Sequence, residues 1–254
     1  MDITISKADG ILTIGFDRPE KKNAITSAMY QTMADALKEG ESNPKVRAIM
    51  LIGLPGVFTA GNDLEDFLKN PPQGENSPVA QYMHALSHAS KPVVAAVSGV
   101  AVGIGTTLLL HCDLVYAADD AKFAMPFSQL GLCPEFASSL TVQRVAGYHR
   151  AAEKLLLGEV FKADEALAMG IVNKVLAPAD LLAYARGQAL KLVALPAASI
   201  RATKQLMKRD QQAQNAAKMV EEMQFFSAML KAPEAKEAFS AFLEKRKPDF
   251  TQFA

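Results

Sequence analysis

An uncharged stretch, residues 93–110, constrains the fold of this chain more than any other segment. It begins with β-branched valines, which favour a buried strand. Gly99, Gly103 and Gly105 then interrupt the strand pattern, and helical spacing resumes at Thr106. A glycine-rich turn between a strand and a helix lets a ligand approach backbone N–H groups. The stretch therefore predicts a place where negative charge on an oxygen is stabilised.

Two other interpretations of residues 93–110 stay open at this point. About eighteen apolar residues can suffice for a transmembrane helix. However, three glycines within seven residues weaken a helix, and the rest of the chain has the patterns of a soluble protein. The stretch is equally compatible with a core strand and helix packed closely through glycine. Its GxxxGxG spacing matches neither the dinucleotide fingerprint GxGxxG nor a phosphate-binding loop ending in Gly-Lys-Ser/Thr.

The composition excludes several classes of partner. Lys+Arg and Asp+Glu both number 27, so no basic excess indicates nucleic acid or an anionic membrane, and we expect neither. The first residues, MDITISKADG, lack the basic and apolar segments of a signal peptide. The last four, TQFA, match neither a peroxisomal nor an ER address. We therefore expect a cytoplasmic protein in which Cys112 and Cys133 are reduced, buried thiols.

The hydrophobic pattern predicts an α/β domain followed by a helical tail, with the boundary near residue 195. Residues 3–16 alternate around Asp9-Gly10, which favours a β-hairpin. A polar loop at 71–76 is expected to be the most mobile segment. The other expected elements are a helix capped by Thr26 or Ser27, strands at 46–54, 113–117, 122–125 and 171–176, a helix at 79–89, and tail helices at 199–208, 211–230 and 233–246. An apolar tail of this kind needs a partner surface, either its own core or another subunit.

Five segments, taken in their order and spacing, resemble the crotonase superfamily, the enoyl-CoA hydratase/isomerase family. They are RPEKKNAI (18–25), FTAGNDL (58–64), the glycine turn with its helix (98–117), PFSQLGLCPE (126–135) and AFLEKRKPDF (241–250). The resemblance covers the whole chain. It implies a crotonase-type spiral of ββα repeats over residues 1–195, and a helical module over residues 196–254 that builds a homotrimer, paired into a hexamer. It also implies an acyl-CoA thioester substrate, with coenzyme A as part of the substrate and no separate cofactor.

The resemblance assigns an oxyanion hole to two backbone N–H groups. Members of the family hold the enolate oxygen of a thioester in this way. By the motif match, one donor is Asn62, which follows Ala60-Gly61, and the other is Ile104, which lies between two glycines. The alternative is that both segments are ordinary loops.

The resemblance also identifies a candidate base. Hydratases of the family use two carboxylates, at the positions that Thr107 and Phe127 occupy here, and neither of these side chains transfers a proton at neutral pH. Glu135 lies eight residues after Phe127, where the peroxisomal-type Δ3,Δ2-enoyl-CoA isomerases carry their catalytic glutamate. That reaction needs a single base, which moves one proton from C2 to C4. The apolar neighbours of Glu135 favour a raised pKa for its carboxyl. Alternatively, a glutamate after proline suits the start of a helix.

The family pattern further implies where coenzyme A binds. The expected contacts are Lys22 and Ala24, then Ala60, Gly61 and the Asp63–Leu64 turn, and finally Phe242 and Lys245. The last two match positions that reach coenzyme A in a neighbouring subunit. Alternatively, they form a solvated helix end whose basic charge suits the helix dipole.

Two classes of rival function remain. The same enolate chemistry serves other CoA-ester reactions, such as hydration or a ring-directed isomerisation, and some relatives act as non-catalytic acyl-CoA-binding scaffolds. We expect no metal, because His84 and His88 have helical spacing but no acidic or cysteine ligand beside them. The serines at 138 and 139 lack a GxSxG elbow, which argues against a serine hydrolase. The isomerase interpretation implies a role in fatty acid metabolism, in which 3-enoyl-CoA esters enter β-oxidation.

Overall fold

A six-stranded sheet and a four-stranded sheet carry the fold in the computed structural model, which describes residues 2–71, 74 and 76–253. The larger sheet begins with the predicted hairpin, in which β1 (Ile3–Ala8) pairs antiparallel with β2 (Ile11–Phe16). Asp9 and Gly10 both have positive φ, as a tight hairpin turn requires. The sheet continues in parallel through β3 (Ala48–Ile52), β5 (Val93–Val97), β7 (Leu114–Ala118) and β10 (Lys174–Leu176).

Three strands of the smaller sheet each directly follow a strand of the larger sheet along the chain. Its order is β4 (Val57–Thr59), β6 (Val100–Val102), β8 (Lys122–Ala124) and β9 (Phe161–Lys162), with only the β8–β9 pair antiparallel. The chain thus moves from β3 to β4, from β5 to β6 and from β7 to β8, adding one strand to each sheet in turn. This repetition is the predicted spiral of ββα repeats, and it brings the ends of β4 and β6 side by side.

The uncharged stretch that dominates the sequence is divided between both sheets. It supplies β5 to the larger sheet and β6 to the smaller one, and then forms α4 (Ile104–Thr107) and the 3-10 turn η2 (Leu108–His111). The predicted strand, glycine turn and helix are therefore confirmed, with the addition of a second strand. No helix in the described ranges is long and apolar enough to cross a membrane.

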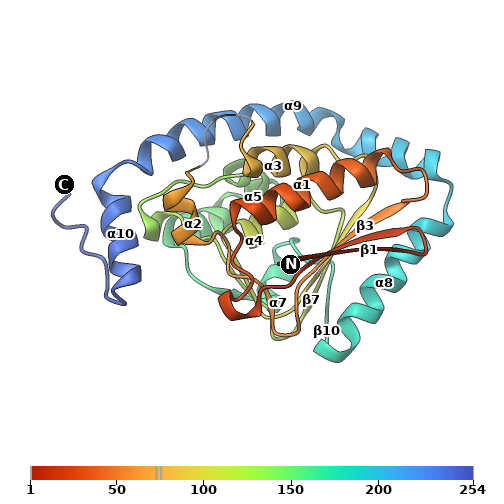
Figure 1. The fold of residues 1–254 in the computed structure, drawn as a ribbon, viewed down its shortest axis with the longest axis horizontal. Helices are drawn as coiled ribbons and strands as arrows, with labels where there is room; N and C mark the ends of the chain where they lie inside the picture. The colour runs from red at the N-terminus through yellow and green to blue at the C-terminus, as the bar shows by residue number, and fades with distance from the viewer. Residues whose placement is uncertain (1, 72–73, 75, 254) are drawn as a thin grey trace.

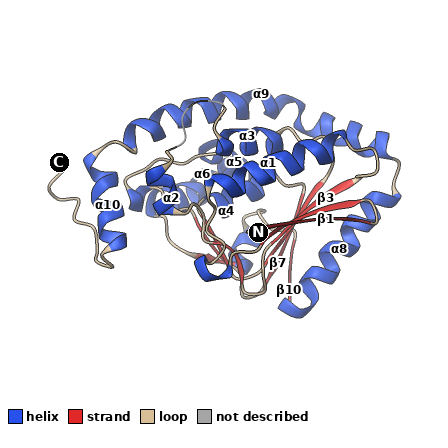
Figure 2. Ribbon diagram, viewed as in Figure 1, coloured by secondary structure: helices blue, strands red, loops and turns tan. Residues whose placement is uncertain are grey.

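Helices cover both faces of the larger sheet (Figures 1 and 2). On one face lie α1 (Ser27–Ser42), capped by the Thr26 hydroxyl as predicted, and α3 (Pro78–Ser87). The opposite face packs on α8 (Pro178–Ala194) through a separate apolar cluster. The remaining short helices are η1 (Pro19–Lys21), α2 (Leu64–Lys69), η3 (Ser128–Leu130), α5 (Ser138–Ala146), α6 (Tyr148–Ala152), the π-helical turn η4 (Glu153–Leu157) and α7 (Ala163–Ala168).

The tail, residues 196–254, differs from its prediction in two respects. A single helix, α9 (Ala197–Met229), replaces the two helices expected at 199–208 and 211–230. The polar residues between them contain no glycine or proline, so nothing interrupts the backbone hydrogen bonds. Next, α10 (Pro233–Leu243) ends three residues earlier than predicted. Figure 1 shows α9 extending across the molecule above α1 and α3, with α10 at one end.

A partly buried ion pair fixes the first half of α9 to the larger sheet. Lys204 Nζ donates to Asp113 Oδ2 at 2.6 Å and to the Lys91 carbonyl at 2.7 Å. Asp113 directly precedes β7, so the pair connects the tail to this strand of the sheet. The tail therefore packs against the core of its own chain.

Two smaller expectations concern cysteine burial and the polar loop. Cys112 and Cys133 are free thiols, but both are half-buried, so the predicted full burial is wrong. Cys112 directly follows η2, and Cys133 lies in the segment between η3 and α5. Residues 72, 73 and 75 of the polar loop lie outside the described residues.

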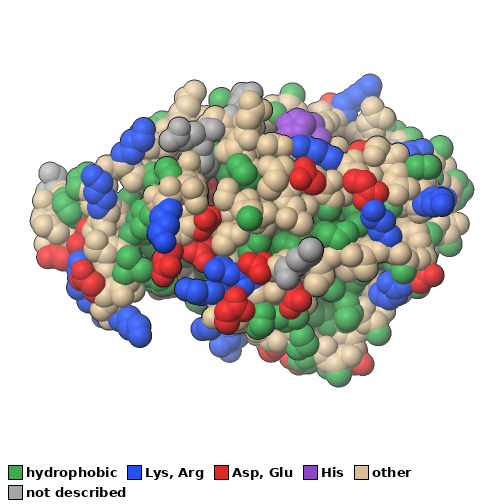
Figure 3. Space-filling model, viewed as in Figure 1, with side chains coloured by type: hydrophobic (Ala, Val, Ile, Leu, Met, Phe, Trp, Pro, Cys, Tyr) green, Lys and Arg blue, Asp and Glu red, His purple; other side chains and the backbone are tan. Residues whose placement is uncertain are grey.

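On the face drawn in Figure 3, basic and acidic side chains are interspersed, in line with the equal charge counts.

Candidate active site

Two backbone N–H groups lie unpaired at the neighbouring ends of β4 and β6. Asn62 follows β4, and Ile104 begins α4 after β6. Over residues 2–71, 74 and 76–253, no hydrogen-bond acceptor is found for either amide. Both residues line a cleft of about 810 Å³. The arrangement offers two donors to one oxygen atom of a ligand, which is what an oxyanion hole needs.

The segment at 18–25 holds the Asn62 loop in place. Ile25 donates its N–H to the Gly61 carbonyl at 2.8 Å, and Asp63 returns a bond to the Ile25 carbonyl at 2.9 Å. The buried Thr59 hydroxyl donates to the Asn23 carbonyl and accepts from the Gly61 N–H. Two of the sequence motifs are therefore joined by backbone bonds.

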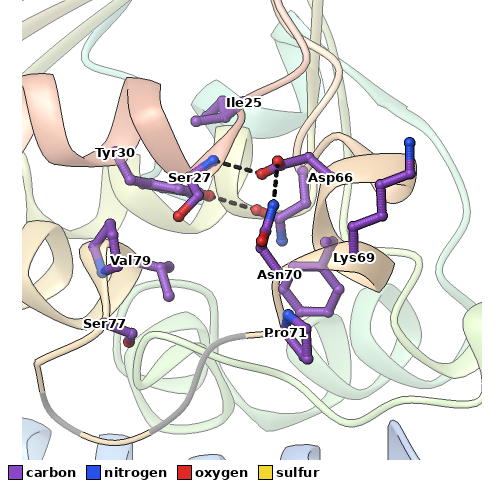
Figure 4. Close-up of a pocket in the computed structure, with 12 residues that line it drawn as sticks. Ile25, Ser27, Tyr30, Asp66, Lys69, Asn70, Pro71, Ser77 and Val79 are labelled. Carbon is purple, nitrogen blue, oxygen red and sulfur yellow. Dashed lines mark hydrogen bonds between the residues drawn. The ribbon is translucent and has the colours of Figure 1, made fainter.

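A buried tyrosine holds the Asn62 side chain. The Tyr30 hydroxyl, from α1, donates to Asn62 Oδ1 at 2.6 Å. Figure 4 shows the Tyr30 ring on one wall of an adjoining cavity of about 420 Å³, with Val79 and Ser77 on another wall. With its side chain fixed by Tyr30, Asn62 keeps its backbone N–H available to the cleft.

Glu135 is buried beside Thr107. The Thr107 hydroxyl donates to Glu135 Oε1 at 2.5 Å, and the carboxyl is only 8% exposed. Burial raises the pKa of Glu135 to about 8, and the charge of Glu222 adds to this, while the bond from Thr107 opposes it. Thr107, at the position of a hydratase carboxylate, thus contacts the candidate base directly. A carboxyl with this pKa can accept and return a proton near neutral pH.

The backbone directly after Glu135 has an unusual conformation. Phe136 and Ala137 have φ of 59° and 57°, a region that residues other than glycine seldom adopt. The buried His111 ring stacks on the Phe136 ring at 3.9 Å, and its Nε2 lies 2.8 Å from the Phe136 carbonyl. Burial lowers the pKa of His111 to about 4, so the neutral ring donates Nε2–H to this carbonyl. On the other side, Glu222 of α9 accepts the Ala137 N–H at 2.6 Å.

Glu135 lines a second cavity, which adjoins the cleft. This cavity has a volume of about 770 Å³ and lies between α3 and α9. Apolar side chains, among them Met83, Met219 and Met223, form much of its wall. Phe67 and Phe226 pack edge to face, with ring centroids 6.1 Å apart, and both line the cleft as well as this cavity. Asn62 also lines both, so the cavity that holds the Glu135 carboxyl meets the cleft at Asn62.

Most of the predicted coenzyme A contacts line the cleft together. They are Lys22, Ala24, Ala60, Gly61, Asp63, Leu64 and Phe242. Phe242 lines the cleft of its own chain, and its predicted reach into a neighbouring subunit stays a prediction. Lys245 is not among the lining residues; it follows α10 in a left-handed conformation, with φ of 55°.

Sequence reasoning missed several residues that build the site. Arg18 donates to the Ala24 carbonyl at 2.9 Å and to Asp63 Oδ2 at 2.7 Å, and so ties two predicted contacts together. Tyr30, Phe67 and Glu222 also escaped notice, because each acts through a partner distant in sequence. Among these residues, only Glu222 has a signal in the sequence that could have marked it as part of the site: it is an acidic residue next to the apolar end of α9.

The histidines at 84 and 88 stack on each other along α3, with ring centroids 4.1 Å apart. In the part of the chain that the structure describes, no group of three or more His, Cys, Asp and Glu side chains is arranged to hold a metal.

Comparison with known proteins agrees with this geometry. The sequence profile of the enoyl-CoA hydratase/isomerase family matches residues 6–253. The chain is 30% identical over 251 residues to the 2,3-dehydroadipyl-CoA hydratase of Escherichia coli (strain K12), covering 98% of each protein. It is 34% identical over 250 residues to enoyl-CoA delta isomerase 2 of Rattus norvegicus, covering 96% of this chain and 64% of that protein. A crystal structure of an enoyl-CoA hydratase/isomerase from Pseudoalteromonas atlantica T6c superposes with a TM-score of 0.94 at 34% identity, over 99% of this chain and 100% of that chain. The chain therefore belongs to the enoyl-CoA hydratase/isomerase family of the crotonase superfamily.

Proposed function

We propose that this protein is a Δ3,Δ2-enoyl-CoA isomerase. The observation that carries the proposal is Glu135, a buried carboxyl in the apolar cavity, bonded to a threonine at the position where a hydratase has a carboxylate. Phe127, at the second hydratase position, is buried and cannot transfer a proton. One base without a second proton-transfer group beside it suits a 1,3-proton shift better than the addition of water.

In the proposed reaction, the acyl chain of a 3-enoyl-CoA ester lies beside Glu135 and its CoA portion lies in the cleft. The Glu135 carboxylate takes a proton from C2, and the electron pair of that C–H bond moves onto the thioester oxygen. The N–H groups of Asn62 and Ile104 donate to this enolate oxygen. Glu135 then returns its proton to C4 while the electrons form the 2,3 double bond, so one proton moves and nothing is consumed. Apolar walls limit access of water, which favours isomerisation over hydration.

Hydration is the main rival, because relatives of both activities resemble this chain at similar identity. One experiment separates the two. Purified protein is mixed with trans-3-hexenoyl-CoA, and the absorbance of the conjugated enoyl thioester is followed. In parallel, a 2-enoyl-CoA ester is offered and loss of that absorbance is recorded. A rise in the first assay without loss in the second supports the isomerase. Loss in the second alone makes the protein a hydratase, and binding without change in either makes it a scaffold.

The pH dependence of turnover tests the role of the raised Glu135 pKa. The base must be deprotonated, so kcat/KM should rise with pH through a midpoint near 8 to a plateau at higher pH. Two pH units below that midpoint, kcat/KM should be roughly a hundredfold below the plateau. The Thr107 hydroxyl stabilises the carboxylate, so Thr107→Val should move the midpoint to higher pH. Thr32→Val, which removes an exposed hydroxyl on α1, serves as the control. A downward shift in the Thr107 variant contradicts this account.

We also propose that residues 196–254 act as a module of a homotrimer or hexamer in the cytoplasm. Support comes from exposed apolar side chains on α9 and on the segment from α5 to the start of β9. They are Val145, Tyr148, Leu156, Leu157, Val160, Leu206, Met207, Val220 and Phe225. Light scattering should give three or six times the chain mass of 27.3 kDa. A single-chain mass at micromolar concentration rules the assembly out.

A further inference from the structure

A second buried glutamate, Glu222, lies on α9 next to the candidate base. It is 5% exposed and lines the same cavity as Glu135. Glu222 Oε2 accepts the Ala137 N–H at 2.6 Å, while Oε1 accepts the Ser139 N–H at 3.0 Å and the Ser139 hydroxyl at 2.6 Å. Two N–H groups and one hydroxyl therefore bind the two oxygens of a single carboxylate.

These bonds hold an unfavourable backbone turn in the site. Phe136 and Ala137 are both left-handed, and they connect Glu135 to the start of α5. No side chain of α5 itself caps its first turn, so Glu222 takes that role from another helix. Its negative charge also suits the N-terminus of this helix. Without the carboxylate, the two N–H groups would be left unpaired inside the protein, and the strained turn would lose its support.

We propose that Glu222 is a positioning residue for catalysis, which orients Glu135 toward the substrate by holding the backbone of residues 136–139. The inference rests on the proposed function of Glu135. Glu222 does not act as a second catalytic acid, because both of its oxygens already accept hydrogen bonds from Ala137 and Ser139 at the start of α5. A carboxylate is needed here because it accepts on both arms, whereas an amide accepts on only one.

Glu222→Gln is the principal test. The variant loses one of the two backbone bonds, so we expect kcat to fall by about tenfold to a hundredfold with little change in KM. Glu221→Gln is the matched control, because Glu221 is the exposed neighbour on the same helix and pairs only with Lys218. A wild-type kcat in Glu222→Gln overturns the proposal, as does an equal loss in Glu221→Gln.

A second readout separates positioning from simple stabilisation. The titration of Glu135 can be followed by NMR with ¹³C-labelled glutamate, the signal being assigned by its absence in Glu135→Gln. Removing the Glu222 charge should move the Glu135 midpoint down from about 8. The other titratable groups facing Glu135 are Tyr30 of α1, Tyr82 of α3 and Cys133. Burial raises the pKa of Cys133 to about 11 and holds the pKa values of both tyrosines well above their usual range. These groups stay neutral near pH 8, so Glu222 supplies the neighbouring charge that acts on the Glu135 midpoint. An unchanged midpoint with only a lower melting temperature assigns Glu222 a structural role.

Glu222→Asp keeps the test valid if the glutamine variant fails to fold. Aspartate retains the charge but is one methylene too short to reach both N–H groups, so kcat should fall while the Glu135 midpoint stays near 8. Wild-type kcat in this variant also overturns the proposal. Because the NMR titration needs no substrate, it distinguishes the two hypotheses. A protein without isomerase activity but with a shifted midpoint would refute the proposed function and leave the Glu222 contact standing.

Discussion

Replacing Glu135 with glutamine is expected to lower turnover of a 3-enoyl-CoA ester by about a thousandfold, with CoA-ester affinity unchanged. Glutamine has nearly the same shape and can still accept the Thr107 hydroxyl through its amide oxygen. It cannot take a proton from C2. The cleft residues expected to contact coenzyme A are untouched by the change. Stopped-flow absorbance gives kcat, and calorimetric titration with hexanoyl-CoA gives the affinity.

The same variant is expected to gain stability relative to the wild type at high pH, although it loses turnover. Glu135 has a pKa of about 8 in the folded protein and 4.5 as an ordinary glutamate. Its protonated form is favoured in the fold, so that contribution to stability is full below pH 4.5 and is lost as the pH rises to about 8. The glutamine variant has no such loss. Its melting temperature should therefore exceed that of the wild type by more at pH 9 than at pH 5. Full turnover in the variant, or a stability difference independent of pH, contradicts the assignment of Glu135 as a buried base.

Gly61→Ala is expected to reduce turnover by about a hundredfold or more, through loss of one oxyanion-hole donor. Gly61 has φ of 88°, and a Cβ at this position would lie 2.7 Å from the Val102 carbonyl oxygen. Both the Gly61 loop and β6 must then move apart. Because Asn62 follows directly, its N–H would no longer point at the enolate oxygen that it and Ile104 share in the proposed reaction.

Gly56→Ala provides the matched control for backbone strain. Gly56 has a similar φ of 78°, but a Cβ there meets no atom within 4 Å. Both variants should lose about 1–2 kcal/mol of stability from the left-handed conformation. Only the Gly61 variant should lose turnover as well. Comparable kcat values in the two variants would show that the close approach to β6 has no catalytic importance.

Local patterns predicted the larger elements of the fold well. The Asp9-Gly10 turn and the valine-rich β5 follow from residue type alone, and both are confirmed. The short strands β4 and β6 were not predicted from the sequence. In addition, β6 is enclosed in one apolar run with β5, so hydrophobicity cannot separate them.

The residues of the site likewise divide into those that local sequence motifs predict and those that they do not. Asn62, Ile104 and most of the predicted coenzyme A contacts lie in short motifs, and the structure gathers them around one cleft. The contacts that fix these residues come from far along the chain. Arg18 reaches Asp63 across 45 residues, and Glu222 reaches Ala137 across 85. Pairings of this kind depend on tertiary packing, which no local pattern encodes.

The position of Glu222 near the end of the chain has a consequence for how activity appears during synthesis. A nascent polypeptide that extends only through α8 can already contain both sheets, the unpaired N–H groups and Glu135. It lacks the carboxylate that holds residues 136–139 and the Phe226 ring beside Phe67. Contacts this distant in sequence form late in folding. If the proposed function holds, a stalled or C-terminally cleaved chain should therefore bind little substrate and show little turnover, so proteolysis within α9 would inactivate the protein.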